Sequence, residues 1–592
     1  MSMCSQYVYK SLQSQSKEIR VLTLLPDVPG TEINCRLDTV SLDDQPQYEA
    51  LSYVWGSSTV RKKVQIEGKE ALVTTNLEIA LQHLRHPEQK RFLWADALRI
   101  DQQNSSEKSW QVQLMGDIYR KASSTIVWLG KNDPEIDQAY DLLELFMQEK
   151  YTIESATEQQ WIGLEKIFLH AEWWTRLWVV QEFVFGQKVV LHFLDYYTGA
   201  PPAVPPRRQR LMKAFKEPLD LFFIKFTDPV RNKNTSKQLV PLENVMEMLS
   251  SKRKCTDPRD YIYSLLGLVT LSDKERIVPD YGKSVKEVYI DFTRLMMNRE
   301  GRLDLLCNTY YDDTRHHDPL SISRPGGRCP SWSVDWSMSR KVESLINTYP
   351  PNSCVFYDAD GGVLVGDEIF MSNDPSTLVL QGVVFDTIIS VSTSFSDLQN
   401  WQALVRKWIP CPITDLEKKF YVHSEEDVLS AYLRTLLRDL ERDTFGMPKG
   451  RLDAQQIQSY EKHFRYWLEH PEDDGDFDKN WTPNADSEIL GKRELEYFLA
   501  CSLVNWCLVS TEKGYIGLAD NMVRAGDRIA VVDGACTPLV LRDVSRVEST
   551  NEESGGNTFT GVCAGYVHGI MDGEVMLMLE SSELEKRSII LA

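Results

Sequence analysis

The chain has 592 residues, a length that predicts about four domain-sized units of roughly 150 residues each. Hydrophobic residues make up 42% of it, so core material is ample and disorder over the whole chain is excluded. The 66 basic and 86 acidic side chains leave a formal net charge of −20, which argues against a nucleic acid partner because phosphate contacts need clustered Lys and Arg.

The first 195 residues alternate predicted strands with predicted helices. Strand-forming residues fill 48–56, 91–95, 124–130 and 188–193. Helical spacing of apolar residues covers 76–84, 104–122 and 158–170. The second helix begins with Asn104 and Glu107, which have the spacing of a capping box. This alternation predicts an α/β unit with a parallel sheet.

The rest of the chain divides into a helical region and a β-rich region. The proline-rich stretch 196–210 is a predicted linker. The segment Asp257–Leu268 is a predicted helix that Pro258 initiates and Gly267 ends. After Asn505, short apolar runs punctuated by glycines predict a small antiparallel sheet or barrel. The expected divisions are 1–195 (α/β), 211–345 (mainly helical), 346–410 with 490–592 (β-rich) and 411–489 (an acidic helical insertion).

The sequence has no feature of a secreted or membrane protein. Its first ten residues lack the apolar region of a secretory signal, and the longest apolar stretch, 499–509, is far short of the ~20 residues that span a bilayer. Its 11 cysteines are scattered without zinc spacing, which indicates reduced thiols. We therefore expect a cytoplasmic protein without a transmembrane segment, a metal or a required cofactor.

The candidate site residues lie at the ends of the predicted parallel strands, where ligands bind in open sheets. Three segments converge there, Tyr53–Gly56, Asp96–Asn104 and Trp178–Glu182. Glu182 lies in an apolar and aromatic run, so burial would raise its pKa and suit it to general acid/base work or to stabilising a cationic transition state. On spacing alone we favour the other interpretation, in which Glu182 pairs with Arg176 or caps a backbone amide.

The remaining polar candidates have two interpretations each. Asp96 and Asp101 are either ligand-binding carboxylates or acceptors for the amides of their own loop, with equal weight. Trp55 is expected to pack in the core together with Trp94 and Trp128. Two weaker groups are better explained without chemistry. They are the acidic and histidine cluster at 312–318, as a metal site, and the turn residues His568, Asp572 and Glu574, as a second active site.

Seven blocks of residues follow one another between Tyr48 and Glu182. They are Tyr48–Gly56, Asn76–Arg85, Leu93–Leu98, Glu107–Val112, Met115–Tyr119, Ala122–Gly130 and Arg176–Glu182. In order and spacing they resemble the heterokaryon incompatibility (HET) domain of fungi. The family usually reads DALCINQ where this chain has Asp96–Gln102, so Arg99 replaces the Cys and Asp101 replaces the Asn. Later blocks resemble the long fungal proteins that carry this domain, at 257–267, 330–336, 511–517, 526–542 and 566–574.

This resemblance implies a role in non-self recognition, in which proteins with the domain trigger growth arrest and regulated cell death. It also implies partners, either a sensor or incompatibility protein or further copies of the chain. The HET domain is similar to the flavodoxin-like TIR fold, and some TIR domains cleave NAD with a Glu in a W-x-x-x-E pattern, which Trp178–Glu182 matches.

The resemblance therefore leaves three functions open. The first is a cell-death effector that acts through protein contacts. The second is an NAD hydrolase in which Glu182 is catalytic, Trp55 or Trp178 stacks on nicotinamide, Asp96 or Asp101 holds a ribose hydroxyl, and Tyr53 lines the substrate site. The third is an enzyme whose activity resides in the C-terminal extension.

Overall fold

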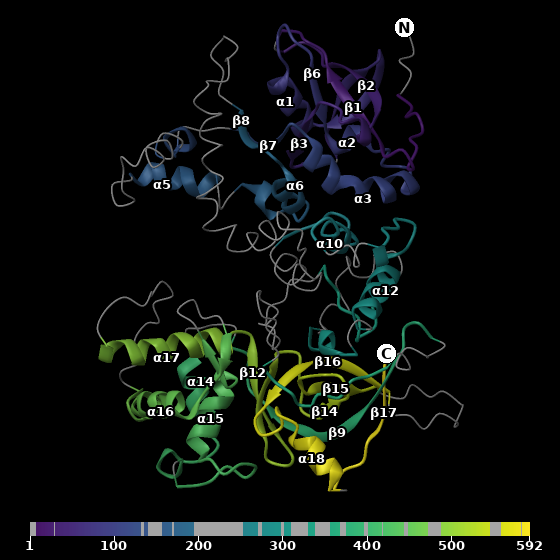
Figure 1. Ribbon diagram of the computed structural model, residues 1–592. Coiled ribbons are helices and arrows are strands. Elements are labelled where there is room, and N and C mark those ends of the chain that lie inside the picture. The colour runs from purple at the N-terminus through teal and green to yellow at the C-terminus, as the bar shows by residue number, and fades with distance from the viewer. Residues whose placement is uncertain are drawn as a thin grey trace. The chain divides into compact units, whose positions relative to one another are not determined.

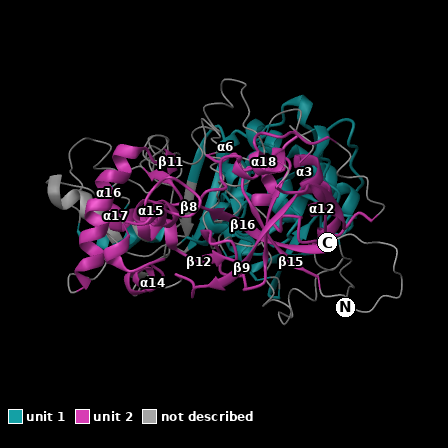
Figure 2. Cartoon of the chain, turned by 90° about the horizontal axis from the view of Figure 1, so that it is seen from below, with its two compact units in different colours: residues 1–283 teal, residues 284–592 magenta. Residues whose placement is uncertain are grey.

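The chain forms two compact units, residues 1–283 and residues 284–592 (Figure 2). The structure, a computed structural model, describes residues 7–28, 30–57, 59–131, 135–139, 142, 157–167, 171–194, 253–269, 275–297, 301–308, 329–337, 356–366, 374–395, 401–416, 418–442, 448–471, 487–544, 558–581 and 583–592. Within these ranges, every helix is too short or too polar to cross a membrane.

The described part of the first unit contains one eight-stranded sheet (Figure 1). In spatial order its strands are β5 (Lys69–Thr74), β4 (Arg61–Ile66), β2 (Asn34–Ser41), β1 (Glu18–Leu24), β6 (Arg91–Trp94), β3 (Glu49–Tyr53), β7 (Ser124–Lys131) and β8 (Val189–Leu194). The last four are parallel to one another, which confirms the predicted parallel sheet. Numbered along the chain these four stand in the order 2-1-3-4, which is the order in flavodoxin-type sheets.

The other half of this sheet is mainly antiparallel and was not predicted from the sequence. Strand β1 pairs antiparallel with both β2 and β6, and β4 pairs antiparallel with β5. The β4–β5 hairpin turns through Glu67 and Gly68, both with positive φ, as a two-residue hairpin turn of type I′ requires. The resulting sheet is mixed, with the parallel strands at one end.

Helices and turns complete the first unit. They are η1 (Leu42–Asp44), α1 (Thr75–Leu84), α2 (Asp96–Arg99), α3 (Ser105–Lys121), α5 (Glu158–Glu165), η4 (Glu172–Thr175), α6 (Val179–Phe185) and α10 (Asp260–Tyr263). One core cluster joins α1 to alternate residues of the strands, such as Leu51 and Trp128. A second cluster joins η4 and α6 to Val127, which is next to Trp128 in strand β7. The two clusters therefore use opposite faces of the parallel strands.

The helix predicted over Asp257–Leu268 is wrong in length. Only Asp260–Tyr263 is helical, and turns follow it. Gly267 does not close a long helix. Instead, a Cβ at this position would collide with the side-chain amide of Gln181, so the glycine permits close packing of this segment against α6.

The second unit is built around a closed set of strands. In spatial order they are β12 (Trp506–Thr511), β13 (Ile516–Asp520), β16 (Thr558–Val567), β15 (Leu539–Asp543), β14 (Arg528–Val532), β9 (Leu378–Val391) and β17 (Arg587–Leu591). The long strand β9 also pairs with β12, which closes β12, β13, β16, β15, β14 and β9 into a barrel. The glycine-punctuated runs after Asn505 therefore did indicate a β-rich barrel.

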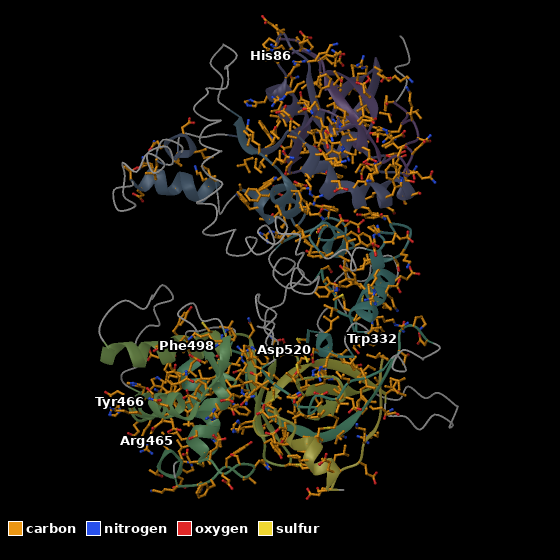
Figure 3. All side chains as sticks on the ribbon, in the orientation of Figure 1. His86, Trp332, Arg465, Tyr466, Phe498 and Asp520 are labelled. Carbon is orange, nitrogen blue, oxygen red and sulfur yellow. The ribbon has the colours of Figure 1, made fainter. Side chains whose placement is uncertain are left out.

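The helices within residues 401–503 gather on one side of this barrel (Figure 1). The remaining elements of the unit are α12 (Val285–Met297), η6 (Asp304–Asn308), α14 (Trp401–Lys407), η9 (Ile413–Asp415), α15 (Val428–Leu437), β10 (Leu440–Arg442), β11 (Pro448–Arg451), α16 (Ala454–Glu469), α17 (Ser487–Leu503) and α18 (Glu574–Glu580). Buried residues of α15, α16 and α17 share one core with strand residues such as Leu508 and Leu518. Figure 3 shows Arg465, Tyr466 and Phe498 on these helices. The segment 411–489 thus supplies helices to the same core as the barrel, while the predicted domain boundaries stay predictions.

Candidate functional site

The centre of the candidate site is a chain of three buried side chains at the end of strand β3. Trp173 Nε1 donates a hydrogen bond to Ser52 Oγ at 2.7 Å, and the Ser52 hydroxyl in turn donates to the Glu182 carboxylate. Glu182 comes from α6, Ser52 from β3 and Trp173 from η4. Each of the three is at most 2% exposed, so the carboxylate is held by a neutral donor away from water.

This environment changes the acidity of Glu182. Burial raises its pKa from 4.5 to about 7, although the positive charge of Arg176 and the Ser52 hydrogen bond lower it. Within the described residues the Glu182 hydrogen bond goes to Ser52, rather than to Arg176 or a backbone amide as the simpler interpretation expected. A carboxyl group of this kind holds or releases a proton near neutral pH and stabilises positive charge when it is ionised.

A second carboxylate lies at the end of the neighbouring strand β6. Asp96 Oδ2 accepts a hydrogen bond from Trp55 Nε1 at 2.8 Å, and Asp96 Oδ1 accepts one from the Ala97 amide. Burial raises the pKa of Asp96, and the charge of Arg176 opposes this shift. Arg176 donates to the carbonyl oxygen of Tyr53, the last residue of β3. The structure therefore brings Asp96 and Trp55 together, with Arg176 acting electrostatically on both Asp96 and Glu182.

The predicted core position of Trp55 is wrong. Its side chain is 36% exposed, whereas Trp94 and Trp128 are buried as predicted. Tyr53 is also buried, on the face of β3 opposite to Ser52, and burial together with Asp96 raises its pKa well above the ordinary value. The exposed indole at the carboxyl edge, with its N–H directed at a carboxylate, makes Trp55 the accessible part of this site.

Two other candidates are engaged elsewhere. Trp178 Nε1 donates to Asp260 Oδ2 at 3.0 Å, so its polar atom faces away from the Ser52 and Glu182 pair. Asp101 Oδ1 accepts from the Gln103 amide at 3.1 Å, which supports the interpretation that it fixes its own loop. Within the described residues, neither side chain forms a hydrogen bond with Glu182 or Asp96.

Ser52 and Trp173 are not among the site residues predicted from the sequence. A signal for Ser52 was present, because it is a polar residue inside a run of strand formers that precedes the candidate Tyr53. Trp173 carried no comparable signal, since tryptophan in an aromatic run is usually a core residue. Only the fold places its indole N–H against the Ser52 hydroxyl.

The weaker candidates of the C-terminal region serve the fold. His568 Nε2 lies 2.6 Å from Glu426 Oε1, and Asp572 forms a two-pronged ion pair with Arg451 at 2.7 and 2.9 Å. Glu574 accepts from the Asp572 amide at 2.8 Å. These contacts favour a structural role for the turn, but the expected hairpin is wrong because the turn leads from β16 into helix α18. The cluster at 312–318 lies outside the described residues.

Two family profiles match the chain. Residues 48–182 match the family described as "Heterokaryon incompatibility protein (HET)", and residues 449–585 match the "Het-6 beta-barrel domain". A curated protein of Neurospora crassa, "Heterokaryon incompatibility protein 6, OR allele", is 23% identical over an alignment that covers 95% of each chain. The findings therefore support a heterokaryon incompatibility protein, with a HET domain at residues 48–182. No solved structure matches it at a significant level.

The two matches fall on the two compact units. The HET match runs from the residue before β3 to Glu182, so it includes Ser52, Trp55, Asp96 and Arg176. The barrel match begins at residue 449, in the hairpin before α16, and ends after α18. The buried Glu182 carboxylate and its hydrogen-bond partners therefore belong to the HET domain.

Proposed function

We propose that the HET domain of this chain is its effector, which triggers growth arrest and regulated cell death through contacts with protein partners and with further copies of the chain. One observation carries the proposal. Three strands of the HET match, β6, β3 and β7, are neighbours in the sheet, and the match includes Ser52, Trp173, Arg176 and Glu182. In this proposal, a sensor or incompatibility partner provides the recognition signal, and the second unit passes it to the HET domain.

The experiment compares two buried tryptophans, one in each unit. Trp173 is 1% exposed in the HET domain and Trp332 is 0% exposed in the second unit. The full chain is expressed from an inducible promoter in fungal cells, and growth and membrane integrity are scored at equal protein abundance. We expect Trp173→Ala to abolish growth arrest and Trp332→Ala to retain it. Arrest that survives Trp173→Ala would contradict the assignment of the effector to the HET domain.

A second candidate function is hydrolysis of NAD at its nicotinamide glycosidic bond, with Glu182 stabilising the cationic transition state. The specific observation in its favour is that the pKa of Glu182 is raised to about 7 at the carboxyl edge of the parallel strands. The 2-1-3-4 order of these strands supports the TIR-like interpretation, since flavodoxin-type sheets bind ligands where the strand order reverses. Because Glu182 is 2% exposed, substrate would reach it only after the Ser52 hydrogen bond opens.

Nicotinamide release from NAD tests this second candidate. The pure full chain is assayed as wild type, as Glu182→Gln and as Glu172→Gln, which changes an exposed glutamate ten residues earlier. Release that Glu182→Gln abolishes and Glu172→Gln leaves intact would support hydrolysis. No release, even from chains crowded on a surface to force self-association, would contradict it. Growth arrest by Glu182→Gln in cells would then assign the effect to protein contacts.

A further inference from the structure

A segment well beyond the HET match packs directly onto helix α6. Leu177 N donates to the carbonyl oxygen of Lys254 at 3.1 Å, and Lys254 N donates to the carbonyl oxygen of Thr175 at 2.6 Å. These bonds place residue 254 alongside the turn that leads into α6, as a parallel β-bridge with Arg176. The segment therefore joins the HET domain through backbone hydrogen bonds as well as through side chains.

Two side chains of α6 face this segment. Trp178 Nε1 donates to Asp260 Oδ2 at 3.0 Å at the start of the helix, and Gln181 donates from its amide to the Ser264 carbonyl oxygen. Gly267 lets the backbone approach Gln181 closely. Val179 and Phe183 face the opposite way, into the core with Trp173. Helix α6 is thus held between the sheet and residues 254–267.

Asp260 is the centre of these contacts. It is 8% exposed, and its second oxygen, Oδ1, accepts from Tyr281 Oη at 2.5 Å. Both of its hydrogen bonds therefore come from neutral donors. Burial raises the pKa of Asp260, and the nearby Asp257 raises it further. Tyr281 is itself attached to α3, since its amide donates to Ser109 Oγ at 3.1 Å and Lys108 Nζ lies 3.7 Å from its ring centroid.

We propose that Asp260 is a positioning residue for Glu182, because it holds Trp178 at the start of α6 and so fixes where the Glu182 carboxylate meets Ser52. Helix α6 has only seven residues, so anchoring Trp178 anchors Glu182 one turn later. Loss of the Asp260 contact frees the first turn of α6, lets water reach Glu182 and weakens the Ser52 hydrogen bond. The proposal concerns the geometry of Glu182 and rests on the proposed function only for its consequence in cells.

Trp173 provides a direct spectroscopic readout, because its indole N–H binds the same Ser52 hydroxyl that binds Glu182. The full chain is labelled with 5-fluorotryptophan and followed by 19F NMR between pH 5 and pH 9. The signals of Trp173 and Trp178 are assigned from Trp173→Phe and Trp178→Phe. Charged or titratable groups that act on Glu182 or respond to it are Arg176, Asp96, Tyr53 and Tyr119. Glu182→Gln removes the titration that belongs to Glu182 and identifies it.

The decisive variant is Asp260→Leu, which keeps the size of the side chain and removes both acceptors. We expect it to shift the Trp178 signal and to lower the midpoint of the Trp173 titration by at least about half a pH unit, a roughly threefold change in the protonation constant. Asp260→Asn keeps an acceptor for Trp178 and should restore the wild-type midpoint. Asp257→Leu is the matched control, since Asp257 lies in the same motif and binds Arg259 and Lys108.

Two results would overturn the proposal. One is an unchanged Trp173 midpoint in Asp260→Leu although the Trp178 signal has moved. The other is a wild-type Trp173 signal that does not titrate in a way that Glu182→Gln abolishes. If Asp260→Leu does not fold, Trp178→Phe removes the donor of the same hydrogen bond and carries the same expected shift. Failure of the growth assay would leave these outcomes unaffected, so the two proposals fail separately.

Discussion

Four buried carboxylates, two in residues 1–283 (the HET unit) and two in residues 284–592 (the barrel unit), are held in different ways. In the HET unit, Glu182 and Asp260 accept hydrogen bonds from neutral donors: a serine for Glu182, and a tryptophan and a tyrosine for Asp260. In the barrel unit, Asp439 is paired with Arg434 and Arg451, and Asp527 receives two hydrogen bonds from Arg542 at 2.8 and 2.9 Å. Burial is similar, since Glu182 is 2% exposed and Asp527 is 3% exposed.

This difference separates a group that changes charge from one that keeps it. A buried carboxylate without a counter-ion gains a proton easily, and the pKa values of Glu182 and Asp260 are accordingly raised by burial. A neighbouring cation favours the ionised form. Burial raises the pKa of Glu426 in the barrel unit, but His568 and Arg434 bring it below its ordinary value. Asp439, Asp527 and Glu426 therefore act as structural ion pairs, whereas Glu182 and Asp260 are suited to respond to their surroundings.

The largest expected effect comes from breaking an ion-paired site. Arg434 and Arg451 both contact the Asp439 carboxylate, and Arg451 Nη2 lies 2.6 Å from Asp439 Oδ2. The substitution Asp439→Ala removes this shared partner. Removing one partner of a buried pair costs about 3–5 kcal/mol, so we expect a loss of that size in the free energy of unfolding of the barrel unit. Hydrogen exchange of β12–β16 in increasing urea measures it. The control is Glu441→Ala, whose exposed pair with Lys449 contributes about 0.2–1 kcal/mol. An Asp439→Ala loss as small as that of the control would contradict the structural role.

Next in size is the effect of Glu182→Gln, which tests the neutral-donor site. Its pKa is about 7 in the folded chain and 4.5 when unperturbed, so the folded state binds more protons between these values. Stability is then fully present below pH 4.5 and falls as pH rises through 7, by about 3 kcal/mol in total. Glutamine cannot ionise, so Glu182→Gln should remove this slope and be more stable than wild type at pH 8. Urea unfolding of the HET unit at pH 5 and pH 8 measures both. Equal wild-type stability at the two values, with Glu172→Gln as reference, would contradict the raised pKa.

A smaller effect is expected at Arg99, a buried side chain that, among the described residues, is neither part of an ion pair nor fully hydrogen-bonded. It is 1% exposed, donates from Nη1 to the Arg20 carbonyl oxygen, and has no partner for Nε and Nη2 within the described residues. Burial lowers its pKa well below the ordinary value. Because unsatisfied buried donors cost about 1–3 kcal/mol, Arg99→Met should stabilise the HET unit by about 1–2 kcal/mol. Thermal unfolding measures the change, and a loss of stability would reveal a partner for the guanidinium.

The sequence predicted the parallel strands well, and the reason is local. Strands β3, β6, β7 and β8 are short apolar runs separated by helices with clear apolar spacing. Each element can therefore be recognised from its own residues. Among the strands that were not predicted, β4 has a weak signal. Strand β4 is mainly polar, with an exposed first half, and its hairpin turns through Glu67 and Gly68 rather than through the more common Asn-Gly or Asp-Gly pair.

Within the candidate site, the sequence identified positions but not partners. Glu182 was found because a carboxylate in an apolar and aromatic run is unusual, and Asp96 because it follows a predicted strand. The Ser52 and Trp173 contacts, and the engagement of Trp178 by Asp260, depend on residues between 82 and 130 positions apart. Spacing along the chain carries no information about such pairs, because only the strand order of the sheet and the path of the chain bring them together.

The smallest predicted effect concerns a contact that the sequence did predict in part. Asn104 caps α3, with its side chain accepting from the Glu107 amide at 3.0 Å, but the Glu107 carboxylate does not complete the expected capping box. It pairs instead with Arg20 at 2.6 Å, as an ion-paired carboxylate inside the HET unit. Asn104→Ala should cost about 1 kcal/mol, and Asn104→Ser should recover most of it. Thermal unfolding measures both. A loss well above that value, which disappears when Glu107 is already changed to Gln, would mean that the cap also orients the ion pair, and the two kinds of carboxylate site would then be coupled through the start of α3.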